Sequence, residues 1–330
     1  MNRARALLVL GLLGLAAAAS LLLALAVGSL TLAPGEVWAG LLGRGDGMVV
    51  EVVRSLRLPR ALSAFACGGL LALAGALMQV LLRNPLADPY VLGISGGAAV
   101  GALAAMLLGV AAGFGLAAAA FAGALAAMAL VFGLAHGDGS WTQTRLLLTG
   151  VIVAAGCGAA VALMLSLAPD RQLRGMLFWL MGDAGQAGDP RATLLVLAAG
   201  LAVALFFARE LNLLTRGPLL AATLGANVPR LRLLLYFLAS LLTATAVTSV
   251  GSVGFVGLVV PHLVRLAVGN DQRLLLPAAT LAGAALLTLA DTLARSVIAP
   301  QQLPVGVLTA LLGVPVFLFL LARAPRGEQA

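Results

Sequence analysis

Lysine is missing from this 330-residue chain, and all 20 of its basic residues are arginine. Without lysine there is no Walker A loop, because that motif needs a Lys to contact the nucleotide phosphates. Schiff-base catalysis by a lysine amine is excluded for the same reason. We therefore expect ATP-driven work, if there is any, to be done by a separate subunit.

Charged residues of either sign are scarce. They make up 10% of the chain against 62% hydrophobic residues, and the mean hydropathy is +1.10. A soluble domain of this size could not cover its surface with so few charges. The apolar residues form repeated runs of about 20, the length of a membrane-crossing helix. These features predict an all-α polytopic membrane protein. Its net charge of +8 comes from arginines scattered over short loops, which favours lipid anchoring over nucleic-acid binding.

Cysteine and histidine are also rare, with two of each. Cys67 and Cys157 lie far apart in apolar segments, so they are expected to be small buried residues and neither a disulfide framework nor a metal site. His136 and His262 have no nearby partners for a nucleophile–base–orienter set. We therefore expect no catalytic residue, no metal site and no cofactor bound by this chain.

Ten segments are predicted to cross the membrane, within one transmembrane domain over residues 1–330. The predicted spans are 6–32, 59–82, 92–112, 114–135, 146–167, 191–207, 233–250, 254–268, 275–296 and 304–322. An even number of spans places both termini on one side. With the termini in the cytoplasm, twelve arginines lie inside and eight outside, as the positive-inside rule favours.

Three polar segments interrupt the apolar runs, at 33–58, 168–190 and 208–232. The first two are predicted outside and could hold short helices. The third is predicted inside and contains a short apolar stretch from Pro218 to Leu224, followed by Gly225 as a helix stop. Such an amphipathic helix either docks into a groove of a partner protein or lies on the membrane surface. The residue pattern alone leaves both options open.

Few ionisable residues fall within the spans. Asp291 and Arg295 are four positions apart and can neutralise each other on one helix face. His262 follows Pro261, and we expect its ring to be hydrogen-bonded across a helix break. The alternative is an ion-coupled secondary transporter that uses Asp291 and His262. A membrane scaffold with no transport role is a third option.

Two further patterns concern surfaces and packing. Arg54, Arg57 and Arg60 precede the second span on the side where the positive-inside rule disfavours arginine, which indicates a role other than topology. Gly93, Gly97 and Gly101 have the four-residue spacing of a small-residue face for close helix packing.

Three long stretches together resemble one known family. They are "RLPRALSAFACGGLLALAGALMQVLLRNPLADPYVLGISGGAAVGA" (57–102), "GFVGLVVPHLVRLAVGNDQRLLLPAATLAGAALLTLADTLAR" (254–295) and "LPVGVLTALLGVPVFLFLLAR" (303–323). They are similar to the FecCD-type permeases, the membrane subunits of type II ABC importers for iron–siderophores, haem and vitamin B12. The resemblance implies ten helices per subunit and a homodimer in the bacterial inner membrane, with both termini cytoplasmic. It also implies two ATPase subunits below the permease and a periplasmic or lipid-anchored binding protein above it.

The resemblance also suggests roles for particular residues. Arg57, Arg60 and Arg295 would meet glutamates of the binding protein, since arginine pairs well with carboxylates; Arg54 has no counterpart. The ATPase-coupling loop is 208–232. Its core would be formed by Leu219, Ala221, Ala222, Thr223, Leu224 and Gly225. The cytoplasmic gate would be formed by Asn84, Leu86, Thr142 and Gln143, where the glutamine departs from the family pattern.

The implied function is substrate import by alternating access, powered by the partner ATPases. The segment "RQLRGMLFWLMGDAGQA" (171–187) leans toward the vitamin B12 type, whereas iron chelates are the commoner substrates of the family. The expected cargo is therefore an iron–siderophore or vitamin B12, with haem third.

Overall fold

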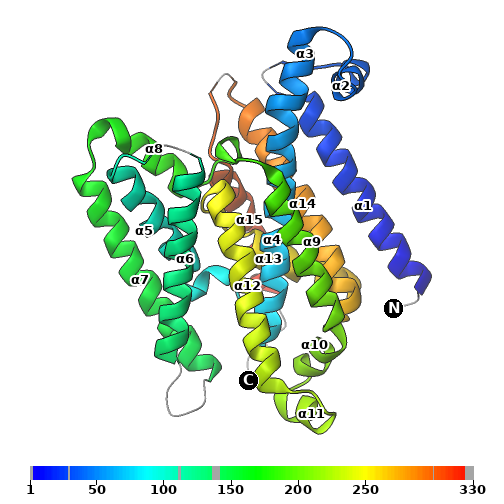
Figure 1. The fold of residues 1–330 in the computed structure, drawn as a ribbon. Coiled ribbons are helices and arrows are strands. Elements are labelled where there is room, and N and C mark those ends of the chain that lie inside the picture. The colour runs from blue at the N-terminus through cyan, green and yellow to red at the C-terminus, as the bar shows by residue number, and fades with distance from the viewer. Residues whose placement is uncertain (1–2, 29, 111–112, 136–141, 300, 324–330) are drawn as a thin grey trace.

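The computed structural model describes residues 3–28, 30–110, 113–135, 142–299 and 301–323. Over these residues it is a bundle of helices without strands (Figure 1). Of the residues considered above, His136 lies outside the described ranges.

Each of the ten predicted spans corresponds to an apolar helix. These helices are α1 (Arg3–Ala26), α4 (Leu58–Leu81), α5 (Ile94–Leu107), α6 (Phe114–Ala135), α7 (Gln143–Leu167), α9 (Pro190–Phe206), α12 (Val228–Val250), α13 (Val256–Val268), α14 (Gln272–Ser296) and α15 (Val305–Arg323). Among the described residues, six helices are long and apolar enough to cross a membrane. The pair α9 and α10 (Ala208–Thr215), bent by 63° between them, makes seven if it is counted as one span, and α5, α13 and α15 are shorter apolar helices. The prediction of a multi-pass helical membrane protein is confirmed.

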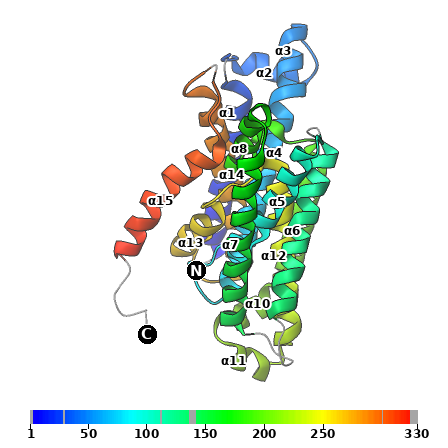
Figure 2. The same cartoon turned by 90° about the vertical axis from the view of Figure 1, so that its left-hand side faces the viewer.

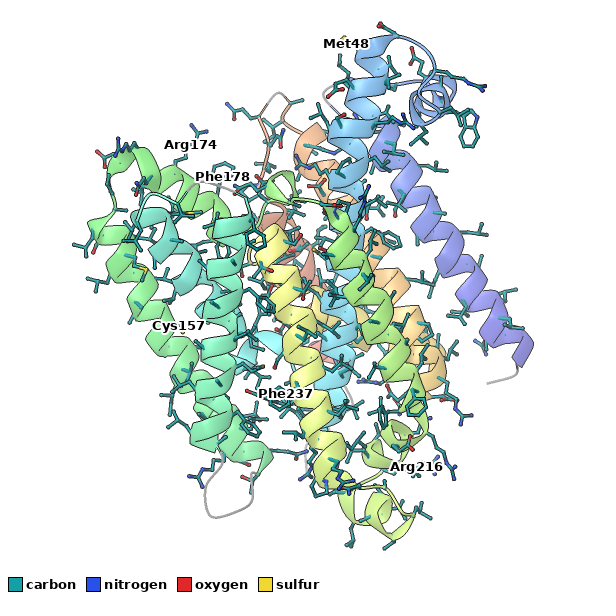
Figure 3. The ribbon with its side chains drawn as sticks, in the orientation of Figure 1. Met48, Cys157, Arg174, Phe178, Arg216 and Phe237 are labelled. Carbon is teal, nitrogen blue, oxygen red and sulfur yellow. The ribbon has the colours of Figure 1, made fainter. Side chains whose placement is uncertain are left out.

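Short helices fill the three polar segments. They are α2 (Pro34–Leu41), α3 (Gly47–Glu51), the π-helix η1 (Val52–Arg57), α8 (Asp170–Met181), the 3₁₀ turn η3 (Ala184–Gln186), α10 and α11 (Pro218–Thr223); a further 3₁₀ turn, η2 (Pro89–Leu92), precedes α5. The elements α2, α3 and α8 lie at one end of the bundle, and α10 and α11 lie at the other (Figure 1). Met48 and Arg216 mark these two ends in Figure 3. We call the first the outer end and the second the coupling end, after the sides and the role expected from the sequence.

The predicted second span, 59–82, matches α4 to within one residue, but the helix itself begins earlier. The helix does not begin at residue 59 but runs without a break from Gly47 to Leu81, through the π-helical turn η1. Pro59 lies just after η1, at the start of α4. If the turn before it were α-helical, the proline ring would clash with a carbonyl of that turn. A wider π turn at this point accommodates the proline and keeps the helix continuous. Arg57 and Arg60 are therefore held on a helix.

The helix break expected beside His262 is absent. Pro261 lies inside α13, which continues to Val268. Because α13 begins at Val256, the missing N–H of Pro261 removes one hydrogen bond near the start of the helix and leaves the later turns intact.

Small residues allow α4 to occupy the centre of the bundle. A Cβ on Gly75 would lie 1.8 Å from the carbonyl oxygen of Gly257 in α13, so the two backbones touch. The expected packing of Gly97 and Gly101 is confirmed, since α6 approaches both at backbone distance. Gly93 instead has a φ of +73° and forms the turn before α5. Cys67 is buried in α4 as expected, whereas Cys157 in α7 is only half-buried, and both are free thiols.

Two helices lie at the edge of the bundle. α1 packs along α14 on one side (Figure 1), and α15 projects away from the body of the molecule (Figure 2). Both expose rows of leucine and other apolar side chains. The first turn of α1 and the last turn of α15 point toward the coupling end, as an even number of crossings requires.

Candidate functional site

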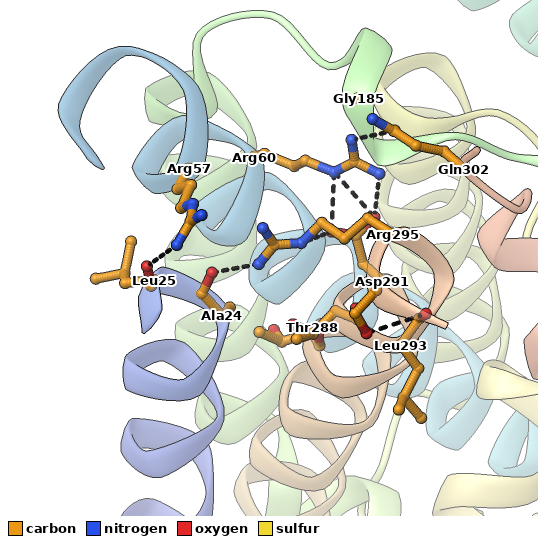
Figure 4. Close-up of polar contacts among 12 residues, drawn as sticks. Ala24, Leu25, Arg57, Arg60, Gly185, Thr288, Asp291, Leu293, Arg295 and Gln302 are labelled. Carbon is orange, nitrogen blue, oxygen red and sulfur yellow. Dashed lines mark hydrogen bonds and ion pairs between the residues drawn. The ribbon is translucent and has the colours of Figure 1, made fainter. Parts of the chain in front are cut away.

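The outer end of the bundle contains a buried ionic cluster centred on Asp291, which is 2% exposed. Arg60 of α4 donates to both carboxylate oxygens, with its Nε 2.9 Å from Oδ2 and its Nη2 2.8 Å from Oδ1 (Figure 4). This is the bidentate geometry that makes arginine–carboxylate pairs strong. The Nη1 atom of Arg60 donates to Gln302 at 2.8 Å, and Asp183 lies 3.7 Å from its Nη2. The pair therefore joins α4, α14 and two outer loops.

Arg57 is 6% exposed and faces the end of α1. Its guanidinium donates to the backbone oxygens of Leu25 at 2.7 Å and Ala26 at 3.0 Å, and also to that of Leu30. The last carbonyls of a helix lack partners within the helix and carry its negative dipole end. Arg57 satisfies these carbonyls and so fixes α1 to the helix that precedes α4.

Arg295 completes the cluster from α14. It is 9% exposed, donates to the backbone oxygen of Ala24 and lies 3.8 Å from Asp291. Its Nε has no hydrogen-bond partner in the described structure. A cavity of about 450 Å³ opens beside the three arginines. It is lined by Leu30, Val52, Ser55, Leu56, Arg57, Pro59, Arg60, Ala184, Gly185, Ala187, Arg295 and Gln302.

The arrangement agrees only in part with the predictions from sequence. The expected contact between Asp291 and Arg295 exists, but the main partner of Asp291 is Arg60, from 231 positions away. Asp183 and Gln302 also contribute, and neither was predicted from the sequence. No local pattern could have indicated them, because each lies in a loop whose position depends on the fold. Arg54 lies one turn before Arg57 and is exposed.

The coupling end presents α11 on a short loop. Ala221 is fully buried, whereas Leu219 is 80% exposed and Leu224 is 58% exposed. Gly225 follows with a φ of +87°, a conformation that favours glycine and ends the helix. The predicted short amphipathic helix with a glycine stop is therefore confirmed as structure. It offers exposed leucines at the end of the molecule opposite the arginine cluster.

The four residues predicted as a gate lie at neighbouring helix ends. Gln143, at the start of α7, donates through Nε2 to the backbone oxygen of Leu81 at the end of α4, at 2.8 Å. Thr142 caps α7 by accepting from the N–H of Arg145. Asn84 accepts from the N–H of Leu86 in a tight turn. The bond from Gln143 to Leu81 therefore links the start of α7 to the end of α4, just before Asn84 in the sequence.

The residues of the ion-coupled alternative have different surroundings. Asp291 is already paired with two arginines, so its negative charge is compensated within the protein. His262 lies on α13, and its Nδ1 is buried without a hydrogen-bond partner among the described residues. No group of three or more potential metal ligands occurs in the described part of the chain.

Comparison with known proteins identifies the family. A model of the FecCD transport family matches residues 15–323. The chain belongs to the FecCD transport family. This membership makes it a membrane permease subunit of the ABC-transporter type, and it confirms the resemblance noted in the three sequence stretches.

Individual relatives support the same conclusion. The FecCD chain is 43% identical over 278 residues to the hemin transport system permease protein HmuU of Yersinia pestis, covering 82% of each chain. It is 45% identical over 272 residues to the cobalamin import system permease protein BtuC of Halobacterium salinarum, covering 82% of this chain and 73% of that one. A solved structure described as an inward-facing, metal-chelate type ABC transporter has a TM-score of 0.83 and 30% identity, covering 96% of this chain and 99% of that one.

Proposed function

We propose that this permease imports a metal chelate by alternating access, with ATP hydrolysed by separate partner subunits. The observation that supports this most is the FecCD family match over nearly the whole chain, together with relatives named for hemin and cobalamin transport. The proposed cargo is an iron–siderophore or cobalamin, with haem as the third candidate.

The cargo can be tested through the partner that would deliver it. The binding protein of this system should be purified without added ligand and its bound compound identified by mass spectrometry. A cobalamin, an iron–siderophore or haem is the expected result. Recovery of a ligand that is not a metal chelate would contradict the proposed substrate class.

The proposed ATPase contact is α11 with its following turn. Leu219 and Leu224 are exposed at the coupling end although they are large and apolar, which suits insertion into a groove of a partner. The contact would include Leu219, Ala221, Ala222, Thr223, Leu224 and Gly225. Leu224→Arg should reduce co-purification of the ATPase subunits by about tenfold, the effect of losing roughly 1.4 kcal/mol of binding. Undiminished co-purification would remove the assignment.

The proposed binding-protein contact is the surface around Arg57, Arg60 and Arg295. The cavity beside them and the excess of positive charge suit a carboxylate of the partner. Arg57 and Arg295 also hold α1, and Arg60 holds Asp291, so substitution of any of the three would change docking and structure together. Charge reversal at Arg60 should weaken docking more than reversal at the exposed Arg54, measured by binding to immobilised permease.

The proposed cytoplasmic gate consists of Asn84, Leu86, Thr142 and Gln143. The bond from Gln143 to Leu81 supports it, because a change in the angle between α4 and α7 would break or form this contact. The proposed homodimer has its support in α15, which projects from the body and exposes Leu311, Leu312 and Leu318. A second copy would cover this face.

A further inference from the structure

An amide side chain joins α10 to the start of α14 at the coupling end. Asn212 of α10 donates through Nδ2 to the Asp271 carboxylate at 2.8 Å. Its Oδ1 accepts from the backbone N–H of Gln272, also at 2.8 Å. Asp271 is the N-cap of α14 and accepts in addition from the N–H of Arg273. One side chain thus makes two bonds to consecutive residues of a neighbouring helix.

The chemistry of the two neighbours determines the orientation of the amide. A backbone N–H can only donate, so the oxygen of Asn212 must face Gln272. The nitrogen of Asn212 then faces the carboxylate, which can only accept while ionised. Neither aspartate nor a hydrophobic residue at position 212 could make both bonds. We refer to Asn212, Asp271 and Gln272 as the amide clamp.

The clamp lies between the proposed ATPase contact and the body of the permease. Only Arg216 and Gly217 separate α10 from α11, and the N–H of Ala221 bonds back to Gly217. Leu211 and Leu214 are buried and hold α10 against the bundle. A displacement of α11 by the ATPase would therefore be transmitted to α10 through only a few residues. The amide clamp then provides a polar connection from α10 to α14.

The other end of α14 reaches the arginine cluster. This helix has 25 residues and so spans about 37 Å at 1.5 Å per residue. It contains Asp291 and Arg295 near its outer end. It is also in backbone contact with α4, because a Cβ on Gly68 would lie 2.2 Å from the oxygen of Gly283. Helices packed this closely move as one body, so movement at the clamp is transmitted to the outer cluster.

We propose that Asn212 is a positioning residue for transport, which couples the ATPase-contacting helices to α14 and thereby to the outer face of the permease. The inference rests on the proposed contact between α11 and the ATPase. It assigns a transmission role to a residue that touches neither the ATPase-contacting turn nor the cargo.

The test uses the complete complex of permease and ATPase subunits in liposomes, with the binding protein added at the outer face. The measured quantity is the ratio of ATP hydrolysis with binding protein to hydrolysis without it. In Asn212→Asp the new carboxylate faces the carboxylate of Asp271, so the hydrogen bond between positions 212 and 271 is lost. We expect the ratio to fall about tenfold, or to unity if the wild-type stimulation is smaller than that. A tenfold change is of the size expected from the loss of one hydrogen bond to a charged group. ATPase co-purification and hydrolysis without binding protein should persist.

The reciprocal pair Asn212→Asp with Asp271→Asn should restore the ratio to within about twofold of the wild type. In that variant the amide nitrogen of Asn at 271 donates to Asp at 212, which still accepts from Gln272. The cap to the N–H of Arg273, which uses the same oxygen of Asp271 in the wild type, is given up. Recovery would show that the bond between positions 212 and 271 is what the coupling depends on. A merely structural role would instead lower ATPase co-purification and hydrolysis without binding protein in Asn212→Asp. The matched control is Ser166→Ala, which removes an exposed hydrogen bond made only within α7 and should leave the ratio unchanged.

Three results would overturn the proposal: a wild-type ratio in Asn212→Asp, no recovery in the reciprocal pair, or no response of the wild-type complex to binding protein. Failure of the underlying contact is recognised separately. If Leu224→Arg retains its ATPase subunits, the assignment of α11 is wrong, whatever the clamp variants show.

Discussion

Among the described residues, Arg60 and Asp291 form the shortest ionic contact of the outer end, at 2.8 Å, with side-chain exposures of 15% and 3%. Arg60→Ala should leave the carboxylate with only the more distant Arg295 and lower stability by about 3 kcal/mol, as breaking one side of a buried pair does. Thermal unfolding of the purified permease measures this loss. Removing both partners in Arg60→Ala with Asp291→Ala should recover part of it.

The control for this experiment is Arg54→Ala, which removes an exposed arginine from the same continuous helix. Its melting temperature should stay within the range of ordinary surface substitutions. Equal melting temperatures for Arg60→Ala and Arg54→Ala would contradict a structural role for the pair.

Asp88 lies between α4 and α5, where its carboxylate accepts from the N–H of Tyr90. Burial raises the pKa of this carboxyl from 3.8 to about 6. Between these values the folded state holds a proton that the unfolded chain has lost, so stability falls as pH rises through about 4 to 6. Asp88→Asn keeps the accepting oxygen and removes the charge of this half-buried side chain.

We therefore expect Asp88→Asn to melt at a higher temperature than the wild type at pH 7.5. The difference should shrink at pH 5, where the wild-type carboxyl is itself protonated. Melting curves of both proteins at pH 7.5 and at pH 5 measure this difference. A difference of the same size at both values would show that the charge of Asp88 is not responsible.

Between helices, stability depends on close backbone packing such as that of α4 against α13. In Gly75→Ala the added Cβ would meet the backbone oxygen of Gly257, so α4 and α13 must separate. Overpacking of this kind costs about 1–3 kcal/mol, and more where backbone must move. The same substitution at Gly11 in α1 meets nothing within 4 Å and should be neutral. Size-exclusion profiles after graded heating compare the two, and similar profiles would contradict the packing argument.

A second copy of the chain is expected against α15 at the scale of the whole molecule. Leu312→Trp enlarges an exposed residue of that helix and should weaken the dimer about tenfold by overpacking the interface. Leu12→Trp enlarges an exposed residue of α1, where lipid can make room, and should leave the dimer intact. Light scattering with the detergent mass subtracted measures both. If Leu12→Trp dissociated the dimer and Leu312→Trp did not, the interface would lie on α1, and the prediction for α15 would be wrong.

Much of the molecule could be predicted from its sequence because the bilayer imposes a simple rule. A backbone in hydrocarbon must satisfy its own hydrogen bonds, so long apolar runs become helices. All ten predicted spans have helices, and the helix stop at Gly225 followed from local residue preferences. The errors arose where two local rules competed, at Pro59 and Pro261. In both places packing kept a helix continuous that proline alone would have interrupted.

The sequence by itself determined the class of protein and excluded a Walker A loop, because both depend on which residue types are present. It also determined the approximate positions of the spans, because these depend on the lengths of the apolar runs. The partners of the charged residues were decided only by the tertiary structure. Asp291 pairs with Arg60 across 231 positions, and Asn212 meets Asp271 across 59. Such contacts depend on how the helices cross, and the crossings depend on backbone approaches such as that of Gly75 to Gly257.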